Sequence, residues 1–170
     1  MQAKTEWSVL MGEKISRWGA GPMFAFLSIA YGVVMFAVDW YFYPLFRIDF
    51  LPDRIILLSG IFLIAIGVPF FMTSLITAMR AYDADKLVTK GIYSLCRHPL
   101  YSSWVILIVP GIALLMKSWT GMTTPIFMFL ILNKLVEKEE GYLEYVYGTS
   151  YLEYKKRVPR IIPVRWKFNR

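Results

Sequence analysis

Four apolar runs, separated by short polar segments, dominate this sequence of 170 residues. They extend from about 21 to 38, 55 to 79, 100 to 116 and 121 to 136. A helix needs roughly 17 to 25 apolar residues to cross a bilayer, so these runs are candidate spans. Hydrophobic residues make up 57% of the chain and charged residues only 18%, which excludes soluble, disordered and disulfide-rich proteins. We therefore expect an all-α integral membrane protein with about four transmembrane helices, forming a single domain over residues 1–170.

Positive charge is concentrated in three of the polar segments. Sixteen of the 19 Lys and Arg residues lie in the N-terminal segment, in the connection between the second and third runs, and in the tail. The other three are Arg47, Arg54 and Lys117. Because cytoplasmic segments of membrane proteins are rich in Lys and Arg, this asymmetry predicts a multi-pass protein with both termini in the cytosol. The net charge of +7 favours the lipid bilayer over nucleic acid as its partner.

The two ends of the chain have helical periodicity of their own. Apolar residues recur at helical spacing within 1–20, which predicts an interfacial helix on the inner leaflet. The tail repeats apolar residues in the same way, so we expect it to be ordered and helical. Gly148 is placed to end one tail helix, and Ser150-x-x-Glu153 is a capping box for the next. The domain then divides into the interfacial helix (1–20), the first two spans (21–79) and a half with a hairpin and tail helices (80–170).

Polar side chains gather in the segment 86–101 and again in the segment 137–140. The third and fourth runs are joined by only 117–120, so they are expected to form an antiparallel hairpin. This hairpin would bring Arg97 and His98 to the same membrane face as Glu139 and Glu140. Antiparallel helix neighbours lie about 8–10 Å apart, so one small ligand could touch both groups. Taken singly, these residues also fit a solvated helix end or contacts with lipid headgroups.

The residue types in these two segments suit a zwitterionic ligand with an onium centre. Carboxylates hold a cationic amine, Arg or Lys holds a carboxylate, and tyrosines flank an onium centre through cation–π attraction. S-adenosylmethionine has all three features, although composition shows only that it is compatible. Metal-ligand spacing is absent from the sequence, so no metal is expected. For the single cysteine, Cys96, a buried inert thiol is the preferred interpretation over a redox-sensitive one.

An ordered set of motifs resembles the isoprenylcysteine carboxyl methyltransferase family, which is related to the membrane phospholipid methyltransferases. The motifs run from Lys86 to Pro163, nearly half of the chain. They are Lys86-Leu-Val-x-x-Gly-Ile-Tyr, Arg97-His-Pro-Leu-Tyr101, Glu139-Glu140, Tyr147-Gly-x-x-Tyr151-x-x-Tyr154 and Val158-Pro-Arg-x-Ile-Pro163. The resemblance implies S-adenosylmethionine-dependent methyl transfer, by in-line displacement, to a lipid-like acceptor that enters sideways between the spans, with S-adenosylhomocysteine as product.

The resemblance also implies roles for individual residues. His98 and Glu140 would be catalytic, with His98 or a carboxylate of the Glu pair acting as base where the acceptor needs one. Lys134 would meet the acceptor, although relatives often carry an Arg near the position that Leu135 occupies here. Tyr151 and Tyr154 would contact the acceptor from the closing tail. The cofactor would be bound by Lys86, Gly91, Tyr93, Arg97, His98, Pro99, Tyr101, Glu139 and Glu140.

Two other functions remain open at this point. Membrane sterol reductases have a similar C-terminal ending and use a nicotinamide cofactor, whereas the His-Pro-Leu-Tyr block and the small size favour the methyltransferase. A non-catalytic membrane adaptor could keep the same fold, although an intact polar set argues against it. Neither the acceptor nor the kind of methylation (O, N or S) follows from the sequence, and neither does the oligomeric state.

Overall fold

The computed structural model of the protein describes residues 19–84 and 86–162. These residues form helices and, apart from an isolated β-bridge between Arg47 and Ser118, no β-structure. The long helices are α2 (Gly21–Tyr41), α3 (Asp53–Asp83) and α6 (Thr123–Tyr147). The shorter ones are η1 (Gly91–Ser94), α4 (Pro99–Ser103), η2 (Trp104–Ile108), α5 (Val109–Leu115) and α7 (Thr149–Arg157). The all-α prediction is confirmed for this part of the chain, whereas the interfacial helix expected within 1–20 falls almost wholly outside it.

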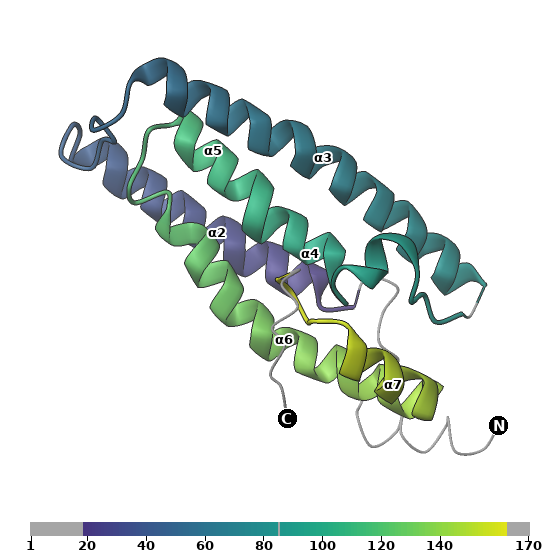
Figure 1. The fold of residues 1–170 in the computed structure, drawn as a ribbon. Helices are drawn as coiled ribbons and strands as arrows, with labels where there is room; N and C mark the ends of the chain where they lie inside the picture. The colour runs from purple at the N-terminus through teal and green to yellow at the C-terminus, as the bar shows by residue number, and fades with distance from the viewer. Residues whose placement is uncertain (1–18, 85, 163–170) are drawn as a thin grey trace, which may run out of the picture.

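The long helices lie side by side as two pairs (Figure 1). One pair is α3 with the continuous rod of α4, η2 and α5, and the other is α2 with α6. The pairs meet where α6 contacts η2 and α5. We call the end of the bundle that carries α4 and α7 the polar end, and the end with the connections 42–52 and 116–122 the turn end. At the turn end the two connections are bonded together, because Trp119 donates to the Phe46 carbonyl at 2.9 Å and Ile48 donates to the Lys117 carbonyl at 2.8 Å.

Two helices are long and apolar enough to cross a membrane, α2 and α3, and Pro99–Leu115 forms a shorter apolar helical segment. Their large apolar side chains point mostly outward: Phe26 is 72% exposed and Phe62 is 63% exposed. A water-soluble protein rarely leaves so broad an apolar surface uncovered. Together with the composition, this surface identifies a membrane protein.

The close approach of α3 and α5 depends on glycine in both helices. A Cβ atom added to Gly60 would lie 2.9 Å from the Gly111 carbonyl oxygen, and one added to Gly111 would lie 2.7 Å from Ile64 Cγ1. Neither distance is compatible with a real side chain. Small residues allow membrane helices to pack backbone against backbone in this way.

Pro110 explains the π-helical turn η2. A proline has no N–H, so it cannot donate to the carbonyl one turn earlier. The chain widens just before it, and the Val109 amide donates to the Trp104 carbonyl, five residues back. The expected third span is therefore helical throughout, but with a π-turn inside it.

Two expectations for the tail need correction. The fourth span was expected to end near Val136, but α6 continues without a break to Tyr147. The helix continues through its charged last turns because Glu140 and Glu144 there form ion pairs with Arg160 and Lys155 of the tail. The predicted capping box is wrong: α7 begins at Thr149 with Gly148 as its N-cap, Ser150 lies inside the first turn, and no side chain caps the helix. Gly148 does end α6, as predicted, with a positive φ of 53°.

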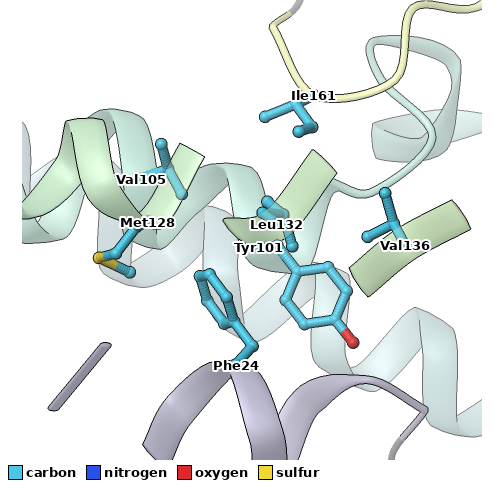
Figure 2. Packing of buried hydrophobic residues seen from close by; sticks show 7 residues of the cluster. All are labelled: Phe24, Tyr101, Val105, Met128, Leu132, Val136 and Ile161. Atoms are coloured by element: carbon cyan, nitrogen blue, oxygen red, sulfur yellow. The ribbon is translucent and has the colours of Figure 1, made fainter. Parts of the chain in front are cut away.

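The larger hydrophobic core lies near the polar end, where the two helix pairs meet. Figure 2 shows Tyr101 between Phe24 of α2, Leu132 and Val136 of α6, and Ile161 of the C-terminal segment. Phe24 and Tyr101 make an edge-to-face contact, with ring centroids 5.3 Å apart. This core holds α4 against α2, α6 and the returning tail, and so fixes the residues that surround the candidate site.

Candidate functional site

The segment before α4 is joined to the C-terminal segment by backbone hydrogen bonds. The Arg97 amide donates to the Pro159 carbonyl at 2.8 Å, and the His98 amide donates to the Arg160 carbonyl at 3.1 Å. Pro99 occupies the first turn of α4, where a missing N–H costs nothing. Residues about 60 positions apart in the sequence therefore lie side by side at the polar end.

Glu140 is the centre of a buried network of charged groups. Its side chain is 2% exposed, and Arg97 donates to its Oε1 at 2.8 and 3.0 Å. Arg160 donates to its Oε2 at 3.0 Å, and His98 Nε2 lies 3.2 Å from its Oε1. Lys155 Nζ lies 3.6 Å from Oε2. A carboxylate with this many partners is fully occupied within the protein.

These partners also set the ionisation of Glu140, which lies beyond the apolar part of α6. Burial alone would raise the pKa of the carboxyl, but hydrogen bonds from His98, Arg160 and Arg97 outweigh it and hold the pKa far below the ordinary value of 4.5. Glu140 is thus anionic at neutral pH in the folded protein.

Arg97 connects this network to the tail. Its Nη1 donates to the carbonyls of Lys155 and Val158, at 2.9 Å each, at the end of α7. Tyr154 adds a second attachment, because its hydroxyl donates to the Tyr93 carbonyl at 2.6 Å. Ser102 adds a third by donating to the Ile161 carbonyl at 2.6 Å. The described part of the tail that is expected to close the site is therefore attached to η1 and to the start of α4.

A cavity of about 1360 Å³ lies between the two helix pairs and extends from the polar end toward the turn end. At its polar end it is lined by Glu139 and by a group of aromatic and basic side chains. These are Lys86, Tyr93, Arg97, His98, Tyr101, Tyr151 and Tyr154. Binding pockets for single small ligands usually occupy about 300–1000 Å³, so this cavity is large enough for two.

Glu139 differs from its neighbour in facing the cavity. Among the described residues, its hydrogen-bond partner is the Tyr101 hydroxyl, at 3.4 Å from Oε2. Gly19 packs directly over the carboxylate, since a Cβ atom there would lie 3.1 Å from Oε2. Glu139 therefore presents a carboxylate to any ligand at this end, with far fewer partners than Glu140 has in the described chain.

Tyr151 carries a polar atom that the described protein does not satisfy. The side chain is 1% exposed, lines the cavity, and its hydroxyl has no hydrogen-bond partner. A buried hydroxyl without a partner is costly, so its usual explanation is a ligand or a water molecule. Burial raises the pKa of the phenol, which keeps the hydroxyl protonated and able to donate.

The structure places the predicted site residues in three different surroundings: in the cavity lining, buried outside it, and exposed. Eight of them line the cavity: Lys86, Tyr93, Arg97, His98, Tyr101, Glu139, Tyr151 and Tyr154. Pro99 and Glu140 are buried outside the cavity lining. Gly91 and Lys134 are exposed and do not line it. Gly91 is the first residue of η1 and has a φ of +64°, a conformation that favours glycine.

Other residues at this end were not singled out from the sequence. The Val-Pro-Arg motif contains Arg160 but does not indicate its role, and the sequence marks Lys155 only as part of the positive tail. Both pair with Glu140. The motif was the available signal for Arg160, whereas nothing in the local sequence pointed to Lys155. Cys96 is buried, with burial raising its thiol pKa and Ser102 as its hydrogen-bond partner.

The cavity combines a polar end and a largely apolar remainder. The polar end combines a carboxylate, tyrosine rings and a free phenol, which suit a ligand with a cationic group and hydrogen-bonding oxygens. The rest of the lining is largely apolar, including Phe36, Leu75, Trp104 and Ile112. A ligand with a polar head and a hydrocarbon chain fits such a cavity.

Comparisons with known proteins agree with the motifs. A family model described as phospholipid methyltransferase matches residues 55–150. A protein-S-isoprenylcysteine O-methyltransferase B of Arabidopsis thaliana is 30% identical over 113 residues, covering 61% of this chain and 57% of the relative. The mouse (Mus musculus) protein-S-isoprenylcysteine O-methyltransferase is 35% identical over 81 residues, covering 48% of this chain and 29% of the relative. The Dictyostelium discoideum protein of that name is 26% identical over 141 residues, covering 81% of this chain and 60% of the relative.

The chain thus spans less than two thirds of the length of these relatives. No solved structure matches it. The comparisons lend no support to a reductase or to an adaptor. Since the family model covers more than half of the chain, the protein belongs to the phospholipid methyltransferase family, and its resemblance to the isoprenylcysteine carboxyl methyltransferases is confirmed.

Proposed function

We propose that this protein transfers a methyl group from S-adenosylmethionine to a lipid-like acceptor at the cytosolic face of a membrane, as an isoprenylcysteine carboxyl methyltransferase does. The observation that carries the proposal is a cavity with Glu139, tyrosines and the unpartnered Tyr151 hydroxyl at one end and apolar walls beyond. Relatives named protein-S-isoprenylcysteine O-methyltransferase support this choice of acceptor class.

The residues at the polar end fit S-adenosylmethionine. The Glu139 carboxylate would hold its ammonium group, and Tyr93 and Tyr101 would face the sulfonium with their ring systems. The Tyr151 hydroxyl would donate to one of its oxygens, which would satisfy the orphaned polar atom. Glu140 would act indirectly, because its ion pairs fasten Arg97 and the tail beside the cavity.

The protein's part in the reaction is alignment and exclusion of water. When bound, S-adenosylmethionine supplies a methyl group whose carbon–sulfur bond breaks, leaving the electron pair on sulfur, as a lone pair of the acceptor forms the new bond to carbon. A carboxylate acceptor becomes a neutral methyl ester and needs no base. A protonated amine acceptor would first give a proton to a base, and His98 is the cavity-lining candidate.

We also propose that the bundle crosses the membrane four times, through α2, α3, the rod of α4 to α5, and the apolar part of α6. The polar end would then face the cytosol together with both termini, as the distribution of Lys and Arg predicts. This orientation places the cofactor-binding end in contact with the cytosol, where S-adenosylmethionine is dissolved, and leaves the apolar walls of the cavity within the bilayer.

The experiment incubates purified protein with methyl-labelled S-adenosylmethionine and two acceptors, an S-farnesylcysteine derivative with a free carboxylate and a phosphatidylethanolamine. We expect label in the first as a base-labile methyl ester. Label only in the phospholipid would contradict the carboxylate acceptor but keep the methyltransferase, whereas no label in either would overturn the proposed function.

Variants locate the cofactor in the same preparation. We expect Glu139→Gln and Tyr151→Phe each to weaken binding of S-adenosylhomocysteine, measured by calorimetric titration, by roughly tenfold, the effect of losing one hydrogen bond or ion pair. Glu140→Gln and His98→Ala would also weaken it. Glu153→Gln, on an exposed position of α7, is the control and should bind normally. Unchanged affinity in both Glu139→Gln and Tyr151→Phe would count against this placement of the cofactor.

A further inference from the structure

The cavity is much longer than a methyl donor requires. On α2 its lining residues extend from Gly21 to Phe36, and on α6 from Thr124 to Tyr147. At 1.5 Å per residue, these stretches are roughly 22 Å and 35 Å long. The two helices of this pair therefore border a space whose length is comparable with the hydrocarbon thickness of a bilayer, roughly 30 Å.

Small side chains line the half of the cavity near the turn end. Gly32 on α2, Ala113 on α5 and Thr124 on α6 face this space, together with Ser118 and Gly121 of the turn. The Ser118 hydroxyl is satisfied, because it lies 2.9 Å from the Thr120 hydroxyl and accepts the Gly121 amide at 2.8 Å. This half of the cavity therefore has room for a ligand but offers no charged group and no free hydroxyl of Ser118 to bind one. A zwitterionic methyl donor would find no favourable polar interaction there.

The opposite end of the same cavity carries independent signs of a ligand, namely the cavity-facing Glu139 and the unsatisfied hydroxyl of Tyr151. A molecule with its head at that end would direct its chain along α2 toward the turn end. Val33 and Phe36, which also line the cavity, are 62% and 52% exposed, so the groove is open sideways to the bilayer at this depth. A hydrocarbon chain can enter and remain in apolar surroundings throughout.

We propose that this half of the cavity holds the hydrocarbon chain of the methyl acceptor, and that Gly32 and Phe36 determine which chain lengths are accepted. The proposal rests on the proposed function. Gly32 lies roughly 16 Å along α2 from Gly21, so its missing side chain leaves the passage open past the middle of the cavity. Phe36 lies one turn further on and limits the chain at the far end.

Gly32 is suited to a test because a side chain there meets little of the protein. A Cβ atom added to it would have Thr124 Cγ2 as its nearest neighbour, at 3.8 Å, an ordinary contact. Gly32→Leu would therefore fill the passage with little direct clash at its Cβ. Val34→Phe is the matched control, since Val34 lies at the same depth on α2, is 55% exposed and does not line the cavity.

The experiment compares cysteine derivatives that carry geranyl, farnesyl or geranylgeranyl chains on the same head. We expect Gly32→Leu to lower the ratio of kcat/KM for the longest chain to that for the shortest by roughly tenfold or more, because several buried CH₂ groups are excluded. We expect Phe36→Ala to shift the ratio the other way and Val34→Phe to leave it unchanged. An equal loss for all three chains, or the same profile in Gly32→Leu and Val34→Phe, would overturn the inference.

Binding of the same three lipids, measured as the rise in Tm that each one causes, separates this inference from the proposed function. Methyl transfer without any change of length profile in the variants would overturn the inference alone and would fit a cavity that holds bilayer lipid. Absence of methyl transfer, with a length-dependent rise in Tm that Gly32→Leu abolishes, would overturn the proposed function alone. Phe36→Ala keeps the test decisive if Gly32→Leu fails to fold.

Discussion

Glu139 and Glu140 are adjacent carboxylates with different surroundings. Successive residues on a helix point about 100° apart, so one of two neighbours can face a cavity while the other faces a packed segment. Glu139 lines the cavity, and Glu140 is 1% exposed among Arg97, His98 and Arg160. The first therefore remains available to a ligand, and the second stabilises the tail.

Glu140 should control stability in a pH-dependent way. Replacing it with Gln leaves Arg97, whose side chain is 8% exposed, without its counter-charge. Breaking a buried pair from one side costs about 3 kcal/mol or more, so Glu140→Gln should lower Tm clearly at pH 7. Because the pKa of Glu140 is depressed in the folded state, its contribution is present above the ordinary value of 4.5 and is lost as pH falls through the folded pKa. The difference in Tm between the wild type and Glu140→Gln should therefore become smaller as the pH falls below about 4.5.

The control for this measurement is Glu153→Gln, at an exposed position, which should match the wild type at every pH. A constant difference between wild type and Glu140→Gln from neutral to strongly acidic pH would show that the charge of Glu140 is not the source of its effect. A wild-type Tm in Glu140→Gln would show that the network does not hold the tail.

Part of this site followed from the sequence and part did not. The hairpin argument correctly brought Arg97 and His98 to the Glu pair, because an antiparallel hairpin returns to its starting face. It could not say which carboxylate faces the cavity, since that depends on how α6 is rotated against α4 and the tail. The partners Lys155 and Arg160 were missed because Lys155 depends on how α7 turns back at Gly148, and Arg160 lies in irregular chain that has no periodic pattern to predict its path.

Among the elements, the long helices were the most predictable part. The apolar runs located α2, α3 and the rod of α4 to α5 within a few residues, and the start of α6, because hydrophobicity over a full helix length is a strong signal. Their ends were less predictable. The Ser150-x-x-Glu153 pattern failed as a cap because α7 has Gly148 as its N-cap, two residues earlier than the pattern requires. The π-turn was not predicted either, although Pro110 is its physical cause.

The crossing of α3 and α5 gives a prediction at this scale. Gly111→Ala places a Cβ atom 2.7 Å from Ile64 Cγ1 and 3.0 Å from the Gly60 carbonyl oxygen, so the two helices must move apart. Overpacking of this kind costs about 1–3 kcal/mol, which should appear as a lower Tm in detergent. Gly141→Ala in α6 is the matched control: nothing lies within 4 Å of its added Cβ. It should raise stability slightly, as alanine does in an exposed helix. A Tm unchanged in Gly111→Ala would mean that the helices do not pack this closely.

At the scale of the whole molecule, the two helix pairs leave a space that neither fills. The pair of α2 and α6 meets the rod of α4 to α5 only through part of its length. The remaining gap is the cavity, with the charged network at one end and small side chains at the other. In the proposed orientation, this cavity would let a water-soluble and a membrane-bound reactant meet, because one end of the cavity is polar and its flank would open to lipid.

The number of membrane crossings depends on the shortest element, the rod of α4 to α5. Pro99–Leu115 is about 25 Å long at 1.5 Å per residue, a little less than the hydrocarbon core of about 30 Å. Its length alone would allow a re-entrant hairpin. The hydrogen bonds of Trp119 to Phe46 and of Ile48 to Lys117 argue otherwise, because they hold the hairpin turn beside the connection between α2 and α3. The hairpin turn must therefore lie on the same side of the membrane as the connection between α2 and α3.

Labelling with a membrane-impermeant maleimide on intact cells tests this arrangement. The native Cys96 is 0% exposed and should not react, so single cysteines can be introduced without replacing it. Asp49→Cys and Trp119→Cys, at the turn end, should both be labelled in intact cells, whereas Glu153→Cys on α7 should be labelled only after permeabilisation. Labelling of Asp49→Cys but not Trp119→Cys would show that the hairpin does not cross the bilayer. Labelling of Glu153→Cys alone would show that the protein has the opposite orientation, in which the Lys- and Arg-rich segments face outward against the usual energetic preference.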